Sequence, residues 1–452
     1  MKKVFVESLN LEAQGVARPV NEDGSPGKVL FIDGALPGEF ISCEIYKVKS
    51  KFEIGRTTQI YKASPARVNP PCPSFGTCGG CSMQHLDARS QLAMKQRVLE
   101  DNFKYLARVK PDILLRPIAG PTWGYRYRGR LSVFKIPKGR VMVGFHQNKS
   151  TRITDMETCA ILPAHLSNLL PKWRELIASL EASAHIAQIE FAVGEGAEPG
   201  SQLSVFVMRH MVNLSDSDRE RIKKFAITHQ IDVWLQSAGL DSAQPFYPKT
   251  SSLCYRLPEF DIEMPFKPTD FTQVNHQINR VLVGRAVRLL EPKPNERVLD
   301  LFCGIGNFTL PLARLSYEVF GVEGSQSLTD RARENAIHNG LDDRVNFNCA
   351  NLFEIDALTI KSWGAASKWL IDPPRDGAMA LAQSLAQLAQ SKKSDDSSYL
   401  PKRIVYVSCN PATLARDAGI LVNEAGYRLH AAGVVNMFPH TSHIESIAVF
   451  ER

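Results

Sequence analysis

A cysteine near the C-terminal end of the chain is the residue best suited to nucleophilic chemistry. Cys409 lies in Ser408-Cys409-Asn410-Pro411, directly after a buried-type strand predicted over 403–407. A thiolate at a strand end can add to an electrophilic carbon and later leave again. Uracil offers such a carbon at C6, and addition there makes C5 nucleophilic enough to accept a methyl group. The motif favours covalent methyl transfer to a pyrimidine, the alternative being that Cys409 is a small buried apolar side chain.

Two acidic residues lie beside predicted strands of the same region. Asp372 begins Asp372-Pro373-Pro374-Arg375 after strand 368–371, and Glu445 precedes the last strand. The covalent route needs a base that removes the C5 proton so that the cysteine can leave. Glu445 is the candidate for that base, with a surface charge as its alternative. The prolines stiffen the backbone around Asp372, which we expect beside the methyl donor or the target base.

A glycine-rich turn follows another buried-type strand and predicts a cofactor site. Strand 297–302 leads into Cys303-Gly304-Ile305-Gly306-Asn307-Phe308, and a helix begins at Thr309. Glycines at such a turn let a cofactor approach the backbone closely. The turn lacks the third glycine of a dinucleotide site, and no Gly-Lys-Ser/Thr follows it. S-adenosylmethionine therefore fits better than a dinucleotide or a P-loop nucleotide, and a bare strand-to-helix turn is the alternative.

The following strands supply further polar contacts for such a cofactor. Glu323 ends strand 318–322, where a carboxylate can accept both ribose hydroxyls. Asn351 follows strand 345–348 and is placed to contact an adenine edge. The frame of strand, Gly-x-Gly turn, helix, strand and acid is a stronger indication than the turn alone.

Four cysteines outside this region have the spacing of a metal site. Cys72, Cys78 and Cys81 lie close together among glycines, and Cys159 follows far downstream. Thiolate-only ligation suits zinc or an iron–sulfur cluster. The spacing does not choose between these two, and a site without metal is the third possibility.

The elements that must position these residues divide the chain into three parts. Residues 1–66 show short alternating strands with closely spaced turns, which predicts a small β-barrel. Residues 67–265 contain the cysteines, a helix over 91–106 and then mostly strands, with helices near 163–183 and 215–228. Residues 266–452 alternate strand and helix, which predicts a mainly parallel sheet. We expect a polar surface loop at 391–398.

Composition restricts the class of protein and its partners. The chain has 452 residues, 44% of them apolar, and a net charge of +7. Neither a signal peptide nor an apolar stretch near 20 residues is evident, so we expect a cytoplasmic protein without a membrane span. Residues 91–152 carry 14 Lys and Arg against 3 Asp and Glu, with aromatic residues among them at 123–130. Cations with aromatic neighbours are typical of nucleic-acid binding, although a solvated strand is the simpler explanation of this one segment.

Taken together, these motifs resemble the bacterial RNA uracil-C5 methyltransferases over nearly the whole chain. The resemblance implies a multidomain α/β protein: an OB-like TRAM barrel that binds RNA (1–66), a central α+β domain (67–265) and a Rossmann-like class I methyltransferase domain (266–452). It implies that the segment near 91–122 packs on the catalytic domain. It assigns Cys409 as nucleophile and Glu445 as proton-abstracting base. It also implies two ligand sets: S-adenosylmethionine contacts at Gln273, Phe302, Asn307, Glu323, Asn351 and Asp372, and a [4Fe-4S] cluster on Cys72, Cys78, Cys81 and Cys159.

The resemblance also bears on the substrate. The tRNA-acting relatives are expected to match only the catalytic half and to lack both the barrel and the cysteine set, so a monomeric enzyme acting on 23S rRNA is favoured. Methylation of another 23S rRNA uridine or of tRNA is an alternative. A cytosine-C5 RNA methyltransferase is another, although those enzymes usually carry a cysteine directly after the Asp-Pro turn. A non-catalytic RNA-binding or assembly factor would explain the barrel and the basic stretch, but not Cys409 with Glu445.

Overall fold

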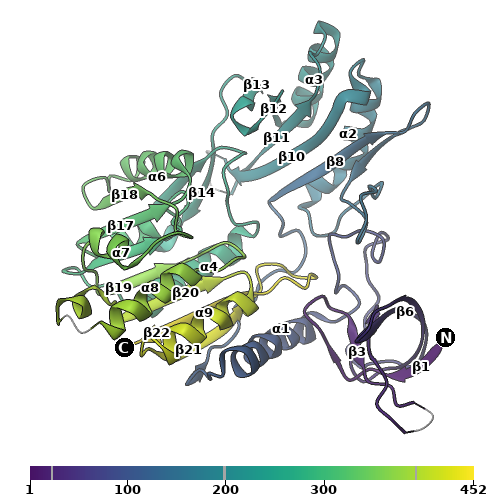
Figure 1. Ribbon diagram of the computed structural model, residues 1–452. Helices are drawn as coiled ribbons and strands as arrows, with labels where there is room; N and C mark the ends of the chain where they lie inside the picture. The colour runs from purple at the N-terminus through teal and green to yellow at the C-terminus, as the bar shows by residue number, and fades with distance from the viewer. Residues whose placement is uncertain (22–23, 197–199, 392–393) are drawn as a thin grey trace.

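Three β-sheets organise the protein (Figure 1). The computed structural model describes residues 1–21, 24–196, 200–391 and 394–452. The α-helices in these ranges are α1 Ala88–Asn102, α2 Ala164–Ser179, α3 Asp216–His229, α4 His276–Leu290, α5 Thr309–Ala313, α6 Gln326–His338, α7 Ala357–Ser362, α8 Met379–Gln390 and α9 Pro411–Asn423. Shorter helical turns are Phe103–Ala107, Ser183–His185, Leu240–Ser242, Pro258–Phe260 and Ser394–Tyr399.

The N-terminal strands form a sheet that closes on itself. These strands are β1 Lys2–Phe5, β2 Ser8–Leu9, β3 Gly15–Ala17, β4 Val29–Asp33, β5 Phe40–Val48 and β6 Phe52–Lys62, in the order β1-β5-β6-β4-β3-β2. Strands β1 and β2 lie at the two ends of that order but are almost continuous in the chain, so the ends meet. Buried Val4, Leu30, Ile32 and Ile41 fill the interior. The expected small barrel is present, and Figure 1 shows it as a ring with the N-terminus at its edge.

The central sheet is mostly antiparallel and has helices packed on it. Its strands are β8 Arg128–Lys135, β9 Val141–Gly144, β10 Ile186–Glu195, β11 Gln202–His210, β12 Asp232–Gln236, β13 Gln244–Tyr247, β14 Leu253–Leu257 and β15 Ile262–Phe266. Trp173 of α2 is fully buried, with its ring centroid 5.0 Å from Phe206 of β11 and 4.6 Å from Phe225 of α3. This aromatic cluster holds α2 and α3 against the sheet.

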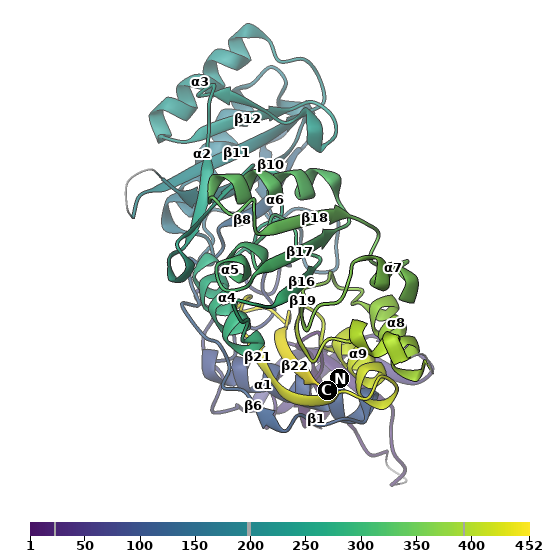
Figure 2. The same cartoon turned by 90° about the vertical axis from the view of Figure 1, so that its left-hand side faces the viewer.

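The C-terminal sheet is parallel along one half. Its strands are β7 Ile113–Leu114, β16 Arg297–Leu301, β17 Glu318–Glu323, β18 Val345–Cys349, β19 Lys368–Ile371, β20 Arg403–Ser408, β21 Arg428–Val435 and β22 Glu445–Glu451, in the order β18-β17-β16-β19-β20-β22-β21-β7. The five neighbouring strands β18, β17, β16, β19 and β20 are parallel to one another, and β22 runs antiparallel to β20. Helices flank this sheet (Figure 2). From β16 the next two strands along the chain, β17 and β18, are added on one side, and the following strands β19 and β20 are added on the other side. In sheets of this kind, ligands bind at the point where the strand order reverses in this way.

A segment that precedes the central sheet belongs in space to the C-terminal sheet. Strand β7 pairs with β21, and Val98, Leu99 and Phe103 share a core with residues of that sheet. Helix α1 begins at Ala88, earlier than the helix expected from the sequence. The Asp87 side chain caps it by accepting hydrogen bonds from the N–H groups of Arg89 and Ser90.

The polar segment 391–398, expected as a surface loop, is in part helical. Ser394–Tyr399 forms a 3₁₀ helix, whereas residues 392 and 393 of that prediction lie outside the described residues. The Asp396 carboxylate is buried and pairs with the Lys361 ammonium at 2.5 Å. In the described parts of the chain, no helix is long and apolar enough to cross a membrane.

Candidate active site

The glycine turn after β16 has the backbone conformation that a close-fitting cofactor requires. Phe302, Gly304 and Gly306 have φ angles of 63°, 56° and 94°. Such left-handed conformations suit glycine, and for Phe302 they are strained, as is common at functional sites. The space that a Cβ on Gly304 would occupy is open to at least 4 Å. The turn therefore leaves the backbone at Gly304 open, beside the strand order reversal.

Glu323 is fixed at the end of β17 by backbone groups on either side. Its Oε2 atom accepts the Gly304 N–H at 3.0 Å, and its Oε1 atom accepts the Ser325 N–H at 3.0 Å. These two bonds orient the carboxylate beside the glycine turn. An acceptor held in this way can bind the two hydroxyls of a ribose.

Of the other predicted cofactor residues, Asn307 belongs to this turn and Asn351 follows the strand next to that of Glu323. Asn351 follows β18, and its Oδ1 atom accepts the Phe353 N–H at 3.1 Å. The Phe353 ring lies 5.7 Å from the Phe302 ring. Asn307 is hydrogen-bonded to residues of α4 and β14. Gln273 is half-buried in the segment that leads into α4.

Strand register brings the predicted nucleophile and base together. Ser408 pairs with Ser446 in antiparallel β20 and β22, so the next residues along, Cys409 and Glu445, are opposite each other. Ile371 pairs with Tyr406 in parallel β19 and β20, which places Asp372 at the same edge. The negative charges of Glu445 and Asp372 both act on the Cys409 thiol. Cys409, Asp372 and Glu445 therefore form one cluster.

Burial raises the pKa of all three groups in this cluster, and like charges add to the rise at Cys409 and Glu445. Burial, with smaller contributions from Glu445 and Asp372, raises the pKa of Cys409 to about 12, and the Arg375 charge opposes the rise. Burial raises the pKa of Asp372. Burial and the Asp372 charge raise the pKa of Glu445, which is only 3% exposed, well above its ordinary value. Two such close carboxyls do not both ionise readily, so one of them is available as an acid and the other as a base.

Arg375 is a functional candidate whose position the sequence did not reveal. Its backbone O atom accepts the Asn410 Nδ2–H at 3.1 Å and the Thr413 hydroxyl at 3.1 Å, which ties the Asp-Pro-Pro-Arg turn to the start of α9. Its guanidinium lies 2.8 Å from His443 Nδ1. Arg375 is therefore held near Cys409 as the cation that favours the thiolate.

The high pKa of Cys409 predicts how its reactivity depends on pH. Because only the thiolate is alkylated and the pKa is about 12, carboxymethylation of Cys409 should be slow at neutral pH. Its rate should rise about tenfold per pH unit between about pH 8 and pH 10, without a plateau. Arg375→Met should slow the reaction further, because the Arg375 charge lowers the pKa. Peptide mapping by mass spectrometry measures this, and a plateau near pH 8 would contradict the assignment.

The loop that leads into Glu445 is clamped by a distant part of the chain. The His440 carbonyl accepts N–H bonds from Ser82 and Met83 at 2.9 and 3.0 Å, and its N–H donates to Gln91 Oε1 at 2.9 Å. Buried Lys95 donates to Asn436 Oδ1 at 3.1 Å and to the Phe438 carbonyl at 2.8 Å. The Trp123 ring stacks on His440 at 3.7 Å. These contacts fix the backbone that places the Glu445 carboxyl.

The four cysteines predicted to bind a metal lie near one another. All nine cysteines of the chain have free thiols. Burial raises the pKa of Cys81 to about 11 and that of Cys159 to about 12, with smaller contributions from charges on the neighbouring cysteines, Cys72 among them. The Gly80 N–H lies 3.4 Å from the Cys78 sulfur. Across the described ranges, however, no group of three or more His, Cys, Asp or Glu side chains is arranged to hold a metal ion.

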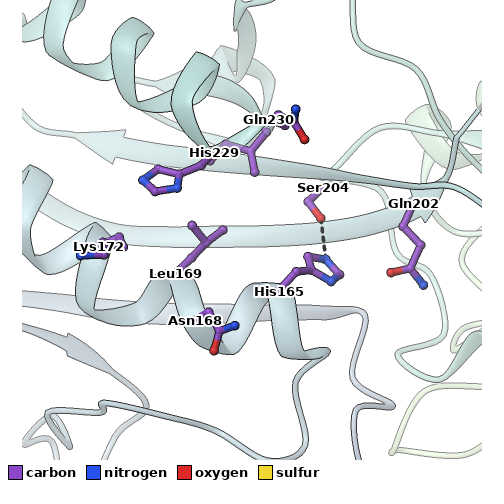
Figure 3. Close-up of a pocket in the computed structure, with 9 residues that line it drawn as sticks. His165, Asn168, Leu169, Lys172, Gln202, Ser204, His229 and Gln230 are labelled. Atoms are coloured by element: carbon purple, nitrogen blue, oxygen red, sulfur yellow. Dashed lines mark hydrogen bonds between the residues drawn. The ribbon is translucent and has the colours of Figure 1, made fainter.

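A cavity of about 490 Å³ lies elsewhere, on the central sheet (Figure 3). Side chains from α2, β11 and the end of α3 line it, and His165 Nε2 lies 2.9 Å from the Ser204 hydroxyl. None of the residues predicted from the sequence lines this cavity. It is therefore separate from the candidate active site.

The fold and the site define a class. A sheet of this strand order, with a Gly-x-Gly turn and an acid at the next strand end, is the architecture of a class I methyltransferase, and the thiol beside two carboxyls is suited to pyrimidine C5 chemistry. The chain belongs to the tRNA (uracil-5-)-methyltransferase family, whose model matches residues 87–452.

The chain is also similar in sequence, over nearly its whole length, to individual named proteins. The 23S rRNA (uracil(1939)-C(5))-methyltransferase RlmD of Cupriavidus metallidurans is 57% identical over 450 residues, which cover 99% of this chain and 94% of that protein. The protein of the same name from Ralstonia pickettii is 55% identical over 448 residues, covering 99% and 98%.

A solved structure extends the likeness in fold. The tRNA (uracil-54, C5)-methyltransferase of Pyrococcus abyssi, in complex with S-adenosyl-L-homocysteine, has a TM-score of 0.71 and 22% identity, covering 99% of this chain and 100% of that one. A protein named for tRNA thus shares the fold along its whole length. The expectation that tRNA-acting relatives match only the catalytic half does not hold for the fold of that protein.

Proposed function

We propose that this protein uses S-adenosylmethionine to methylate C5 of a specific uridine in 23S rRNA, of the uracil 1939 type. The observation that carries the proposal is the cluster of Cys409, Asp372 and Glu445 at strand ends beside the glycine turn. The identity of 57% to a relative with that named activity supports the substrate.

The reaction can be written from the residues of the cluster. The Cys409 thiol passes its proton to the neighbouring Asp372 carboxylate and adds to C6 of the uracil, and the electron pair of the C5=C6 bond moves into an enolate. S-adenosylmethionine, when bound, supplies the methyl group that C5 takes up. Glu445 then removes the C5 proton, the electrons re-form the C5=C6 bond, and the Cys409 thiolate leaves. Buried Glu445 is suited to this step, because desolvation makes its carboxylate a stronger base than an exposed one.

In the proposal, different residues contact different parts of the S-adenosylmethionine molecule. Glu323 would accept the ribose hydroxyls, Asn351 would contact the adenine edge, and the glycine turn with Asn307 would contact the methionine part. Phe302, Asp372 and Gln273 would complete the site. The hydrogen bonds from backbone N–H groups to both oxygens of Glu323 support this assignment, because they fix the carboxylate before the cofactor binds.

In the proposal, the chain is divided into three domains. Residues 1–66 form an RNA-binding barrel of the TRAM type, residues 67–265 a central domain, and residues 266–452 the methyltransferase domain, on which the segment near 91–122 packs. Exposed aromatic side chains on the barrel, Phe40, Tyr46 and Tyr61, support an RNA-binding role, because bases can stack on them.

Methylation assays with defined RNA would test the function. Purified protein, labelled S-adenosylmethionine and unmodified 23S rRNA should give 5-methyluridine, whereas tRNA transcripts should give little product. Nucleoside analysis by mass spectrometry distinguishes this product from 5-methylcytidine. Product only in tRNA would move the protein to the tRNA-acting enzymes, and 5-methylcytidine would support the cytosine alternative.

We further propose that Cys72, Cys78, Cys81 and Cys159 hold a [4Fe-4S] cluster. Four free thiols that influence one another, in a largely apolar surrounding, form a donor set that suits iron–sulfur ligation. The N–H of Gly80, directed at the Cys78 sulfur, is a contact that stabilises a bound thiolate. The sulfur positions would have to adjust when a cluster binds, since the described residues contain no ready-made metal group.

A cysteine substitution tests this cluster directly. Cys81→Ser should remove most of the iron from protein purified without oxygen and should weaken RNA binding, because the ligands tie together segments far apart in the chain. S-adenosylmethionine affinity should stay within about twofold. Elemental analysis measures the metal, with Cys254→Ser, another buried thiol, as the control. Stoichiometric zinc in colourless wild-type protein would overturn the cluster but leave the methyltransferase proposal intact.

A further inference from the structure

The Asn307 side chain belongs to a small hydrogen-bond network at the glycine turn. Its Oδ1 atom accepts the Tyr255 hydroxyl at 2.9 Å and the Asn279 Nδ2–H at 2.9 Å, and its Nδ2 atom donates to Asn279 Oδ1 at 3.0 Å. Tyr255 is 3% exposed and Asn279 is 2% exposed, whereas Asn307 is half-buried. The network therefore has a buried side, formed by β14 and α4, and an accessible side at Asn307.

The network does not use the full hydrogen-bonding capacity of the Asn307 amide. An asparagine amide accepts two hydrogen bonds at Oδ1 and donates two from Nδ2. Both acceptor positions of Asn307 and one donor position are used within the network. A single N–H group remains to bind a ligand.

The Tyr255 hydroxyl determines which way the Asn307 amide is turned. A reversed Asn307 amide could keep its two bonds with a reversed Asn279, but its NH₂ group would then face Tyr255. The buried Tyr255 hydroxyl would lose the acceptor for its proton, and in the described ranges no other partner of that hydroxyl is found. Because a buried donor without an acceptor is costly, the arrangement with Oδ1 toward Tyr255 is favoured.

We propose that Tyr255 and Asn279 are positioning residues that make Asn307 a donor, so that Asn307 recognises the carboxylate of the methionine part of S-adenosylmethionine. This inference rests on the proposed function. The ammonium of the same methionine part is itself a donor and cannot pair with an N–H group. Tyr255 belongs to the central sheet, so that sheet helps to define cofactor specificity.

Binding to a matched pair of ligands tests the inference. Isothermal titration calorimetry with S-adenosylmethionine and with its decarboxylated analogue isolates the carboxylate. Tyr255→Phe should weaken S-adenosylmethionine binding roughly fivefold to tenfold and change binding of the analogue less than about twofold. Tyr427→Phe is the control, because the Tyr427 hydroxyl is also buried but donates to the Pro401 carbonyl.

A second variant changes the donor itself. Asn307→Asp replaces the free N–H with an acceptor, so S-adenosylmethionine binding should fall about a hundredfold and analogue binding much less. Thermal unfolding of each variant identifies any loss of folded protein. Equal losses for both ligands, or no loss in either variant, would overturn the inference. Failure of the wild-type protein to bind S-adenosylmethionine would instead reject the proposed function.

Discussion

Cys409→Ala should abolish methyl transfer while leaving the cofactor site intact. Without the thiol nothing adds to C6, C5 stays a poor nucleophile, and kcat should fall by at least about a thousandfold. S-adenosylmethionine affinity should change less than about twofold, because the turn and Glu323 that would hold it are untouched. Initial rates with radiolabelled cofactor and calorimetric titration measure the two quantities.

RNA containing 5-fluorouridine makes the same prediction visible as a covalent product. Fluorine at C5 cannot leave as a proton does, so the wild-type enzyme should remain attached to the RNA, and peptide mapping should find the link at Cys409. Cys409→Ala should give no adduct, whereas Cys349→Ala, which removes an exposed thiol, should behave as wild type. Full activity of the Cys409 variant would reject covalent catalysis.

Glu445→Gln should stop the reaction at elimination, after methyl transfer. The amide keeps the shape of the side chain but cannot take the C5 proton, so addition and methylation proceed and elimination stalls. We expect kcat to fall about 10²–10⁴-fold and a methylated protein–RNA adduct to accumulate. Denaturing gels with radiolabelled S-adenosylmethionine show such an adduct directly.

A second acid on the same strand provides the control for this variant. Glu451 lies at the far end of β22 and pairs with Arg403 at 2.7 Å, so Glu451→Gln should turn over normally without an adduct. If Glu445→Gln turned over normally, the base would have to be another group, and Asp372 would be the next candidate.

The strand ends were predictable because parallel strands have a strong local signal. Buried apolar runs before Glu323, Asp372 and Cys409 define β17, β19 and β20, and their carboxyl ends meet at one edge of the sheet. The helix and strand pattern after residue 266 therefore gave the class of fold. Boundaries such as the start of α1 at Ala88 depend on capping and were less accurate.

Contacts between distant segments could not be predicted in this way. The proximity of Glu445 to Cys409 depends on the antiparallel insertion of β22 beside β20, and no local pattern specifies that pairing. Gln91 meets His440 across 349 positions, and Tyr255 reaches Asn307 from a different sheet. Arg375 acts through the electrostatics of the folded site, which its position after two prolines does not reveal.

Mapping 5-methyluridine in ribosomal RNA tests the central claim most directly. Mass spectrometry of 23S rRNA from a strain that lacks this protein should show one uridine, of the uracil 1939 type, without its methyl group. The wild-type gene should restore the modification, and the Cys409→Ala gene should not. Unchanged 5-methyluridine in 23S rRNA of the deletion strain would contradict the account.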